Sequence, residues 1–325
     1  MLILSDSDLR AVLTMRDVID AVEQGFRALA RGDVTSPERL RLDVPTHNAV
    51  LLEMPAFAGL DGAEALGTKV VSVFEQNAKR GLDIVQAVYL LLDSETGVPL
   101  SLMDGRFITA IRTAATSAVA TKLMAGSGSK RLAVFGAGVQ ARFHIEAMIE
   151  VAELEQVIIV SRTADKAIAL ADRVRAVHGL PCQVVSSEKA VATANLICTC
   201  TSSPTPLFDG ELLNAGTHVN AVGAFTPSTR ELDTEVVRRA RVIIDAESAG
   251  REAGEILIPL SEGAIDTSHV KGTLAEVVSG TVPGRESPAE ITLFKSCGLA
   301  IEDLVTAWLA YAKARVGGIG ARVEL

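Results

Sequence analysis

The spacing of hydrophobic and polar positions changes along the chain and predicts two kinds of structure in its first part. Residues 5–31 have apolar side chains at helical spacing and predict two helices, with Ser5 or Asp6 as the first cap and Gly32-Asp33 as the stop. From about residue 39 to residue 103, short runs alternate with turn clusters: RLRLDV, AVLLEM, GTKVVSVF, IVQAVYLLLD and PLSLMD. We expect an antiparallel, hairpin-rich region there, followed by a helix from about 107 to 125 that ends at GSGS.

After GSGS the pattern becomes one of short β-branched runs separated by helical spacers. The six runs are LAVF, VIIVS, CQVVS, LICTC, HVNAVG and VIIDA. This alternation is typical of a doubly wound parallel sheet, so we predict a Rossmann-type α/β domain over residues 121–299. The first part forms an α+β domain over residues 1–120. The segment ITLFKSCGLAIEDLVTAWLAYAKARV opens near Lys295–Gly298 and becomes a long helix, and we expect residues 300–325 to complete the first domain.

The stretch RLAVFGAGVQA predicts a dinucleotide site. Its glycines lie between a predicted strand and a predicted helix, which is the context that a phosphate-binding loop needs. Gly136 permits a tight turn, Gly138 lets the backbone approach a pyrophosphate, and Ala141 allows close helix packing, while N–H groups at the helix start face the phosphate. The alternative is a glycine turn without a ligand.

The end of the second strand of this domain indicates which dinucleotide is bound. NAD-specific folds usually have an acidic residue there, which binds the ribose hydroxyls and repels a 2′-phosphate. Here VIIVSRT has Ser161, Arg162 and Thr163 instead, a guanidinium and two hydroxyls that can donate to phosphate. We therefore expect NADPH, with NADH as a weaker donor. The alternative is that Arg162 is a solvated loop residue.

Composition and charge exclude several classes of function. The 325 residues allow two domains, and 48% hydrophobic with 22% charged residues is typical of a packed protein. Thirty-one Lys and Arg against 40 Asp and Glu, a net charge of −9, disfavour nucleic acid and anionic lipid as partners. No window approaches the roughly 18 apolar residues of a membrane span, so we expect a soluble, cytoplasmic protein. The four cysteines fit neither a disulfide framework nor a zinc site; we expect buried thiols and no metal.

Four cations are candidates for binding an anionic substrate. Alternation in GTKVVSVF puts Lys69 on the same face as Val71 and Val73, so its ammonium shares a side with apolar residues. Arg112 lies in the first turns of the helix FITAIRTAA, where the helix dipole favours an anion. Arg39 and Arg41 alternate onto one face of RLRLDV. Together they form a candidate carboxylate clamp, although each alone could be a surface charge.

These motifs together resemble one known family. GTKVVSVF is followed by VPLSLMDGRFITAIRTAATSAVATKLMA, LAVFGAGVQAR, NAVGAFTPSTRELD and LFKSCGLAIEDL. In this order and over about residues 30–310, they are similar to the ornithine cyclodeaminase and mu-crystallin family. The resemblance implies a homodimer formed through the domain outside the Rossmann fold, so residues 1–120 would serve substrate binding and dimerisation.

The resemblance also implies roles for particular residues. In the family, the carboxylate of an amino or imino acid is held by a lysine of the GTK strand, the arginine of RTAA and an arginine of the early strand. These carry over to Lys69 and Arg112, which we expect to be catalytic, and to Arg39 or Arg41. The residues expected to contact the dinucleotide are Arg112, Gly136, Gly138, Val139, Gln140, Ser161, Arg162, Thr163, Thr201, Val222, Gly223 and Ala224.

One departure from the family pattern separates two activities. In the family pattern that this chain resembles, ornithine cyclodeaminases and the related alanine dehydrogenases have an aspartate two residues after the glycine of AVG. This chain has Phe225 at that position. A phenyl ring cannot transfer a proton, so the chain resembles the ketimine reductase branch. We expect NADPH-dependent reduction of cyclic imino acids in proline metabolism, from Δ1-pyrroline-2-carboxylate to L-proline and from Δ1-piperideine-2-carboxylate to L-pipecolate.

Two other functions stay open at this point. The first is an ornithine cyclodeaminase, converting L-ornithine to L-proline and ammonia, with Glu53 or Asp83 as a displaced acid. The second is an NADPH-binding dimer without significant turnover.

Overall fold

The computed structural model describes residues 1–324, which form two compact units. The first comprises Met1–Thr113 and the segment from Leu299 onward, and the second comprises Ala114–Gly298. The boundaries expected from the sequence are at 120/121 and 299/300. The boundary between Thr113 and Ala114 falls inside helix α3 (Gly105–Met124), because this helix continues from one unit into the other.

The first unit is built on one mixed sheet whose strand order is β16-β1-β7-β6-β5-β4-β2, with β3 also paired to β4. Strands β4 to β7 are antiparallel neighbours, as predicted, whereas β1 runs parallel to β7. Its elements are β1 (Leu2–Leu4), α1 (Asp6–Val12), α2 (Met15–Arg31), β2 (Val34–Thr35), β3 (Leu40–Val44), η1 (Pro45–His47), β4 (Ala49–Leu60), β5 (Ala63–Phe74), η2 (Glu75–Arg80), β6 (Val85–Leu92), β7 (Pro99–Asp104), the start of α3, α11 (Ala300–Gly317) and β16 (Ala321–Arg322).

The first of the two N-terminal helices begins, and the second ends, where the sequence predicts. Ser5 caps α1 in a capping box, in which its hydroxyl accepts from the Asp8 N–H and the Asp8 carboxylate accepts from the Ser5 N–H. Gly32 ends α2 in the left-handed conformation, with φ of 81°. Both predictions are confirmed.

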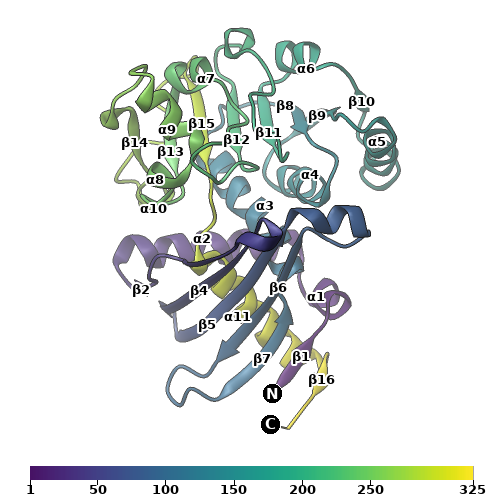
Figure 1. Ribbon diagram of the computed structural model, residues 1–325, viewed down its shortest axis with the longest axis vertical. Helices are drawn as coiled ribbons and strands as arrows, with labels where there is room; N and C mark the ends of the chain where they lie inside the picture. The colour runs from purple at the N-terminus through teal and green to yellow at the C-terminus, as the bar shows by residue number, and fades with distance from the viewer. Residues whose placement is uncertain (325) are drawn as a thin grey trace. The chain divides into compact units, whose positions relative to one another are not determined.

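Helices cover one face of this sheet. Figure 1 shows α2 and α11 behind the strands, and α11 packs on β4, β5 and β6. Alternate residues of β4 and β5 are buried beneath the helices. The opposite face has exposed apolar side chains, among them Leu40 at 56%, Leu42 at 54% and Val88 at 46% exposure. The first unit is thus a two-layer arrangement with one apolar sheet face uncovered by its own helices.

The second unit is a parallel sheet with the strand order β10-β9-β8-β11-β12-β15-β13-β14. Both faces are buried, because Ala133 and Phe135 belong to a core with residues of α6 and α7 while Leu132 and Val134 point to the other side and are equally buried. Its elements, after the end of α3, are β8 (Lys130–Phe135), α4 (Val139–Val151), β9 (Leu154–Val160), α5 (Ala164–His178), β10 (Cys182–Val184), α6 (Ser187–Thr193), β11 (Leu196–Thr199), η3 (Gly210–Leu212), β12 (His218–Ala221), α7 (Thr234–Arg239), β13 (Ala240–Ile244), α8 (Ala249–Glu252), α9 (Gly254–Ser261), η4 (Thr267–His269), β14 (Val270–Thr273), α10 (Leu274–Ser279) and β15 (Ile291–Lys295).

The prediction of a doubly wound parallel sheet is confirmed, but two of its strands were missed. Strand β15, the sequence ITLFK, lies between β12 and β13, and all five of its residues are buried. The sequence pattern predicts ITLFK as the start of the segment that becomes the terminal helix. That helix begins only at Ala300. A five-residue apolar run is too short for its period to separate a buried strand from a helix. The edge strand β14 is still shorter and includes Gly272, whose φ of 157° interrupts any alternation.

Two further expectations can be compared with the structure. All four cysteines are thiols; Cys182 and Cys198 are buried as expected, but the expectation is wrong for Cys200 and Cys297, which are partly exposed because they follow strand ends. Among residues 1–324, no helix combines the length and the apolar character that a membrane crossing requires.

Candidate functional site

Two of the predicted clamp residues lie together in the first unit, and each is paired with a carboxylate. Lys69 Nζ donates to Asp303 Oδ2 at 2.6 Å, and Arg112 Nε donates to Asp303 Oδ1 at 2.9 Å. Arg112 Nη1 also donates to Glu302 Oε2 at 2.5 Å. All four side chains are 5% exposed or less. Asp303 therefore bridges the two cations, in a cluster with as many carboxylates as cations.

Strand register and helix packing bring this cluster together. Lys69 lies opposite Met54 of β4 and Tyr89 of β6, on the sheet face that α11 covers. Glu302 and Asp303 lie in the first turn of α11, where the dipole stabilises negative charge. The helix thus delivers two carboxylates onto the face from which Lys69 projects.

Burial and neighbouring charges shift the titration of this cluster. Burial, and then the charge of Arg112, lower the pKa of Lys69 to about 8 against the opposing effect of Asp303. Burial also disfavours the charged form of Arg112, but Asp303 and Glu302 outweigh it and raise the Arg112 pKa. Burial, and then the Asp303 charge, raise the pKa of Tyr89 well above its usual value, so its hydroxyl stays neutral. The Lys69 ammonium therefore loses its proton at a lower pH than an ordinary lysine does.

The position of Arg112 differs from the expectation in one respect. Helix α3 begins at Gly105, two residues earlier than predicted, so Arg112 is in the third turn, further from the helix start than expected. Free backbone N–H groups end after the first turn, and the dipole argument therefore fails at this position. Its guanidinium instead donates hydrogen bonds to the carboxylates of α11.

The other two candidate cations, Arg39 and Arg41, lie beside and within strand β3. Arg41 is exposed and donates to Asp43 Oδ1 at 2.7 Å, while Arg39 is half-buried and immediately precedes β3. Arg41 lies opposite Leu52, whose partner on β5 is Val71, so the register puts Arg41 on the same sheet face as Lys69. A role for Arg39 or Arg41 in substrate binding stays a prediction.

The carboxylates nearest the clamp are ones that the sequence interpretation did not select. It considered Glu53 and Asp83 as acids; Glu53 lies on the sheet face opposite Lys69, and Asp83 is exposed and pairs with Arg106. The available signal for Glu302 and Asp303 was two adjacent acids inside the apolar run LAIEDLV. Two adjacent acidic residues are also common in the first turn of a helix. The sequence alone therefore did not distinguish a buried functional pair from an ordinary helix start.

In the second unit, the glycine loop has the geometry that a pyrophosphate needs. Gly136 follows β8 with φ of +116°, and a Cβ there would lie 2.6 Å from the Cys200 carbonyl oxygen, so only glycine fits. Gly138 is the N-cap of α4, and no described atom lies within 4 Å of where its Cβ would be. The N–H groups of the first turn of α4, at Val139 and Gln140, therefore follow a residue with open space beside its backbone. These residues fit a dinucleotide phosphate.

The residues expected to bind the rest of a dinucleotide also follow strand ends. Ser161, Arg162 and Thr163 come directly after β9; Arg162 and Thr163 are exposed, and the Thr163 N–H donates to Ser161 Oγ at 3.2 Å. No carboxylate is present in this short segment to repel a 2′-phosphate.

The loops after β11 and β12 are joined by one buried carboxylate. Thr201 and Gly223 both donate to Glu231, a residue that the sequence interpretation quoted in RELD but gave no role. Val222 is half-buried and Ala224 buried, and Phe225 follows them as a half-buried side chain. The predicted Thr201 is thus already bonded within the protein through both its N–H and its hydroxyl.

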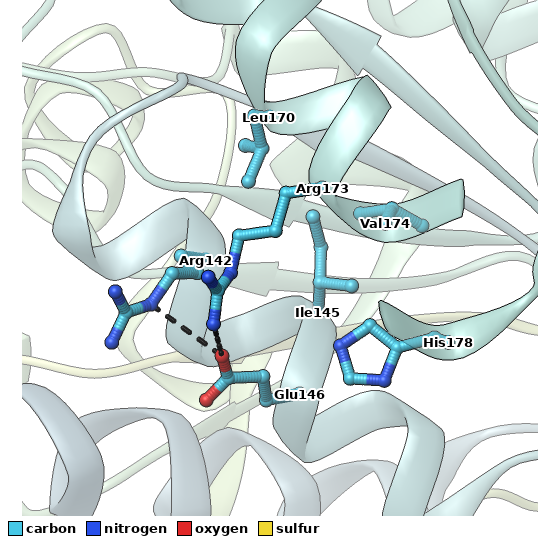
Figure 2. Close-up of a pocket in the computed structure, with 7 residues that line it drawn as sticks. All are labelled: Arg142, Ile145, Glu146, Leu170, Arg173, Val174 and His178. Carbon is cyan, nitrogen blue, oxygen red and sulfur yellow. Dashed lines mark ion pairs between the residues drawn. The ribbon is translucent and has the colours of Figure 1, made fainter. Parts of the chain in front are cut away.

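A small pocket elsewhere in the second unit contains none of the predicted site residues. Figure 2 shows Arg142 and Arg173 directed toward Glu146, at 3.4 and 3.8 Å. All its lining residues belong to α4 and α5. This hollow is the groove between two helices, held by a surface ion-pair network.

Comparison with known proteins identifies the family of the chain. The model of the ornithine cyclodeaminase/mu-crystallin family matches residues 1–318. The chain belongs to the ornithine cyclodeaminase/mu-crystallin family. This membership agrees with the resemblance seen in the motifs.

Among the relatives in this family, a Δ1-pyrroline-2-carboxylate reductase of Bacillus cereus is 37% identical over 327 residues, which cover 100% of both chains. The ketimine reductase mu-crystallin of Mus musculus is 38% identical, over 90% of each chain. The solved structure of the Thermococcus litoralis Δ1-pyrroline-2-carboxylate reductase in complex with NADH and L-proline is 42% identical, with a TM-score of 0.96 over 99% of this chain and 100% of that one.

Proposed function

We propose that this chain is an oxidoreductase acting on CH–NH bonds, which reduces cyclic imino acids with a nicotinamide cofactor. The observation that carries the proposal is the buried clamp, in which Lys69 and Arg112 are held by one carboxylate. Full-length similarity to Δ1-pyrroline-2-carboxylate reductases supports it, as does the glycine loop before α4. The substrates are Δ1-pyrroline-2-carboxylate, giving L-proline, and its six-membered homologue, giving L-pipecolate.

The clamp residues position the substrate. The Lys69 ammonium and the Arg112 guanidinium attract the substrate carboxylate, and their ties to Asp303 restrict how both groups can turn. The reduced nicotinamide supplies a hydride to the imine carbon when it is bound. The nitrogen takes a proton from a solvent-linked donor, so the C=N double bond becomes a C–N single bond, with one new C–H bond and one new N–H bond.

Phe225 favours reduction over deamination. It follows Ala224 after β12, at the position where cyclodeaminases of the family carry an aspartate. An apolar side chain offers no acid or base for amine or water activation, whereas reduction of a preformed imine requires neither. We therefore place the chain in the ketimine reductase branch.

NADPH is the cofactor that we propose, with NADH as a weaker donor. The basis is the exposed Arg162 after β9, beside two hydroxyls and without a carboxylate. The structure of the Thermococcus litoralis relative contains NADH. The preference of this chain for NADPH over NADH is therefore tested by direct measurement.

We further propose a homodimer that forms through the uncovered sheet face of the first unit. Leu40, Glu53, Val70 and Val88 form one cross-strand row on this face, and exposed Leu42 lies in the next row. Large exposed apolar patches of this kind mark interaction sites. A cytoplasmic location also remains a prediction from the sequence.

The decisive experiment is a substrate panel with purified protein. Oxidation of NADPH and of NADH would be followed with Δ1-pyrroline-2-carboxylate, Δ1-piperideine-2-carboxylate, and pyruvate plus ammonium, while ammonia release from L-ornithine is assayed in parallel. We expect turnover of the cyclic imines and none of ornithine. Turnover confined to pyruvate plus ammonium, or to ornithine, would reject the proposal.

A further inference from the structure

The Glu231 carboxylate joins two loops of the second unit that come from neighbouring strands. Its Oε1 accepts from the Thr201 N–H at 2.7 Å and from the Thr201 hydroxyl at 2.6 Å. Its Oε2 accepts from the Thr199 hydroxyl and from the Gly223 N–H, both at 2.7 Å. Four donors therefore converge on one side chain, which is fully buried.

These bonds require a carboxylate rather than another polar group. Each oxygen faces a backbone N–H, which can only donate, so neither oxygen can be replaced by a donor without repulsion. Burial raises the pKa of Glu231, while the Thr201 and Thr199 hydrogen bonds and the Lys295 charge oppose this shift. Burial of a carboxylate destabilises a fold unless hydrogen bonds compensate for the lost water. Here the hydrogen bonds of Glu231 hold two loops at a fixed spacing.

A second layer holds Glu231 itself in place. The Glu231 N–H donates to Glu255 Oε1 at 2.8 Å, and Glu255 Oε2 lies 3.4 Å from Lys295 Nζ. Lys295 Nζ also donates to the carbonyls of Ala221 and Ala224, on either side of Gly223. The three side chains are fully buried, and together they fix the backbone from the end of β12 to Ala224.

The two loops are packed so closely at Gly223 that neither backbone can shift toward the other. A Cβ on Gly223 would lie 2.0 Å from the Thr201 carbonyl oxygen and 2.8 Å from the Glu231 carboxyl carbon. A change at Glu231 therefore moves the backbone of one loop against the other.

We propose that Glu231 is a positioning residue for the cofactor, which sets the spacing between Thr201 and the Val222–Ala224 segment. This inference rests on the proposed function and on the expectation, from the family resemblance, that both segments contact the dinucleotide. It extends that function to a residue that contacts neither substrate nor cofactor and acts only through the loops it holds.

The test compares Glu231→Gln with a matched control, Glu276→Gln. Glu276 also accepts from a backbone N–H and a threonine hydroxyl, both of Thr273, but in the cap of α10. For each purified full-length variant, the Kd of NADPH and of NADH is measured by nicotinamide fluorescence, together with the Tm and the KM of the imino acid. We expect Glu231→Gln to weaken dinucleotide binding about tenfold or more, the equivalent of one lost hydrogen bond to a charged group, with the KM of the imino acid at saturating NADPH unchanged. Glu276→Gln should lower the Tm and leave the Kd unchanged.

Each outcome decides the proposal. A folded Glu231→Gln variant with the wild-type Kd overturns it, as does an equal loss of binding in Glu276→Gln. If Glu231→Gln does not fold, Thr199→Val removes one of the four bonds at nearly constant shape; a Kd about threefold weaker supports the proposal, and a wild-type Kd overturns it. A wild-type protein that binds NADPH but reduces no imino acid rejects the proposed substrate while the Kd comparison still stands. A wild-type protein that binds no dinucleotide overturns both.

Discussion

Replacing Asp303 with asparagine tests whether a buried carboxylate keeps Lys69 charged. Asp303 Oδ2 is 2.6 Å from Lys69 Nζ, and its other oxygen is 2.9 Å from Arg112 Nε. Asparagine keeps the shape but removes the charge, and its amide nitrogen must face one of these two donors. Arg112 retains Glu302 as a partner, so Lys69 is the cation that loses its compensation.

The magnitude follows from the burial of the pair. Removing one partner of a buried ion pair costs about 3–5 kcal/mol, and one pKa unit corresponds to about 1.4 kcal/mol. The lysine can avoid this cost by losing its proton, so the pKa of Lys69 should fall by about two to four units from its present value of about 8. At pH 7 Lys69 is mostly charged in the wild-type protein and should be mostly neutral in Asp303→Asn. Losing a charge-assisted contact with the substrate carboxylate is worth about 1.5–3 kcal/mol, which predicts a loss of about ten- to a hundredfold in kcat/KM.

The assay is the pH profile of kcat/KM for Δ1-pyrroline-2-carboxylate with NADPH. The wild-type value should decline as the pH rises through about 8, where Lys69 loses its proton, and the decline should move to lower pH in Asp303→Asn. Asp17→Asn is the control, because Asp17 pairs with Lys313 in the same unit at a partly exposed site. An Asp303→Asn variant with the wild-type alkaline limb and rate would refute the reasoning.

The remaining predictions concern stability, cofactor choice and reaction type. Because folding lowers the pKa of Lys69 from 10.5 to about 8, the unfolded chain binds more protons between these values, so the free energy of unfolding should rise with pH across this window; urea titrations should show a smaller rise in Lys69→Met. Ser5→Ala removes the α1 cap and should cost about 1 kcal/mol in the same urea assay, with activity unchanged. Arg162→Ala should narrow the affinity gap between NADPH and NADH by about 1–3 kcal/mol in fluorescence titrations, and equal wild-type affinities would contradict the assignment. Phe225→Asp should add at most a trace of ammonia release from L-ornithine, whereas release by the wild-type protein at a rate comparable to imine reduction would return the chain to the cyclodeaminases.

The sequence by itself determined what depends on neighbours along the chain. Helix and strand periods follow from side-chain geometry within a few residues, so α2, the hairpin strands and the βαβ alternation could be predicted. The same is true of the glycine loop, because the backbone at Gly136 requires a residue without a Cβ. The absence of an acid at Phe225 and after β9 is likewise a property of residue identity alone.

Only the tertiary structure decided which charges meet. Lys69 and Asp303 are 234 residues apart, and their contact depends on the β4–β5–β6 register and on how α11 packs across it. Strand β15 could not be placed between β12 and β13 from a five-residue run, because its pairing is set by the sheet and not by its own period. The role of Glu231 depends on two loops that meet only when their strands are adjacent. Local sequence specifies each element, but the partner of a buried charge is specified by contacts between elements, and no short-range pattern encodes them.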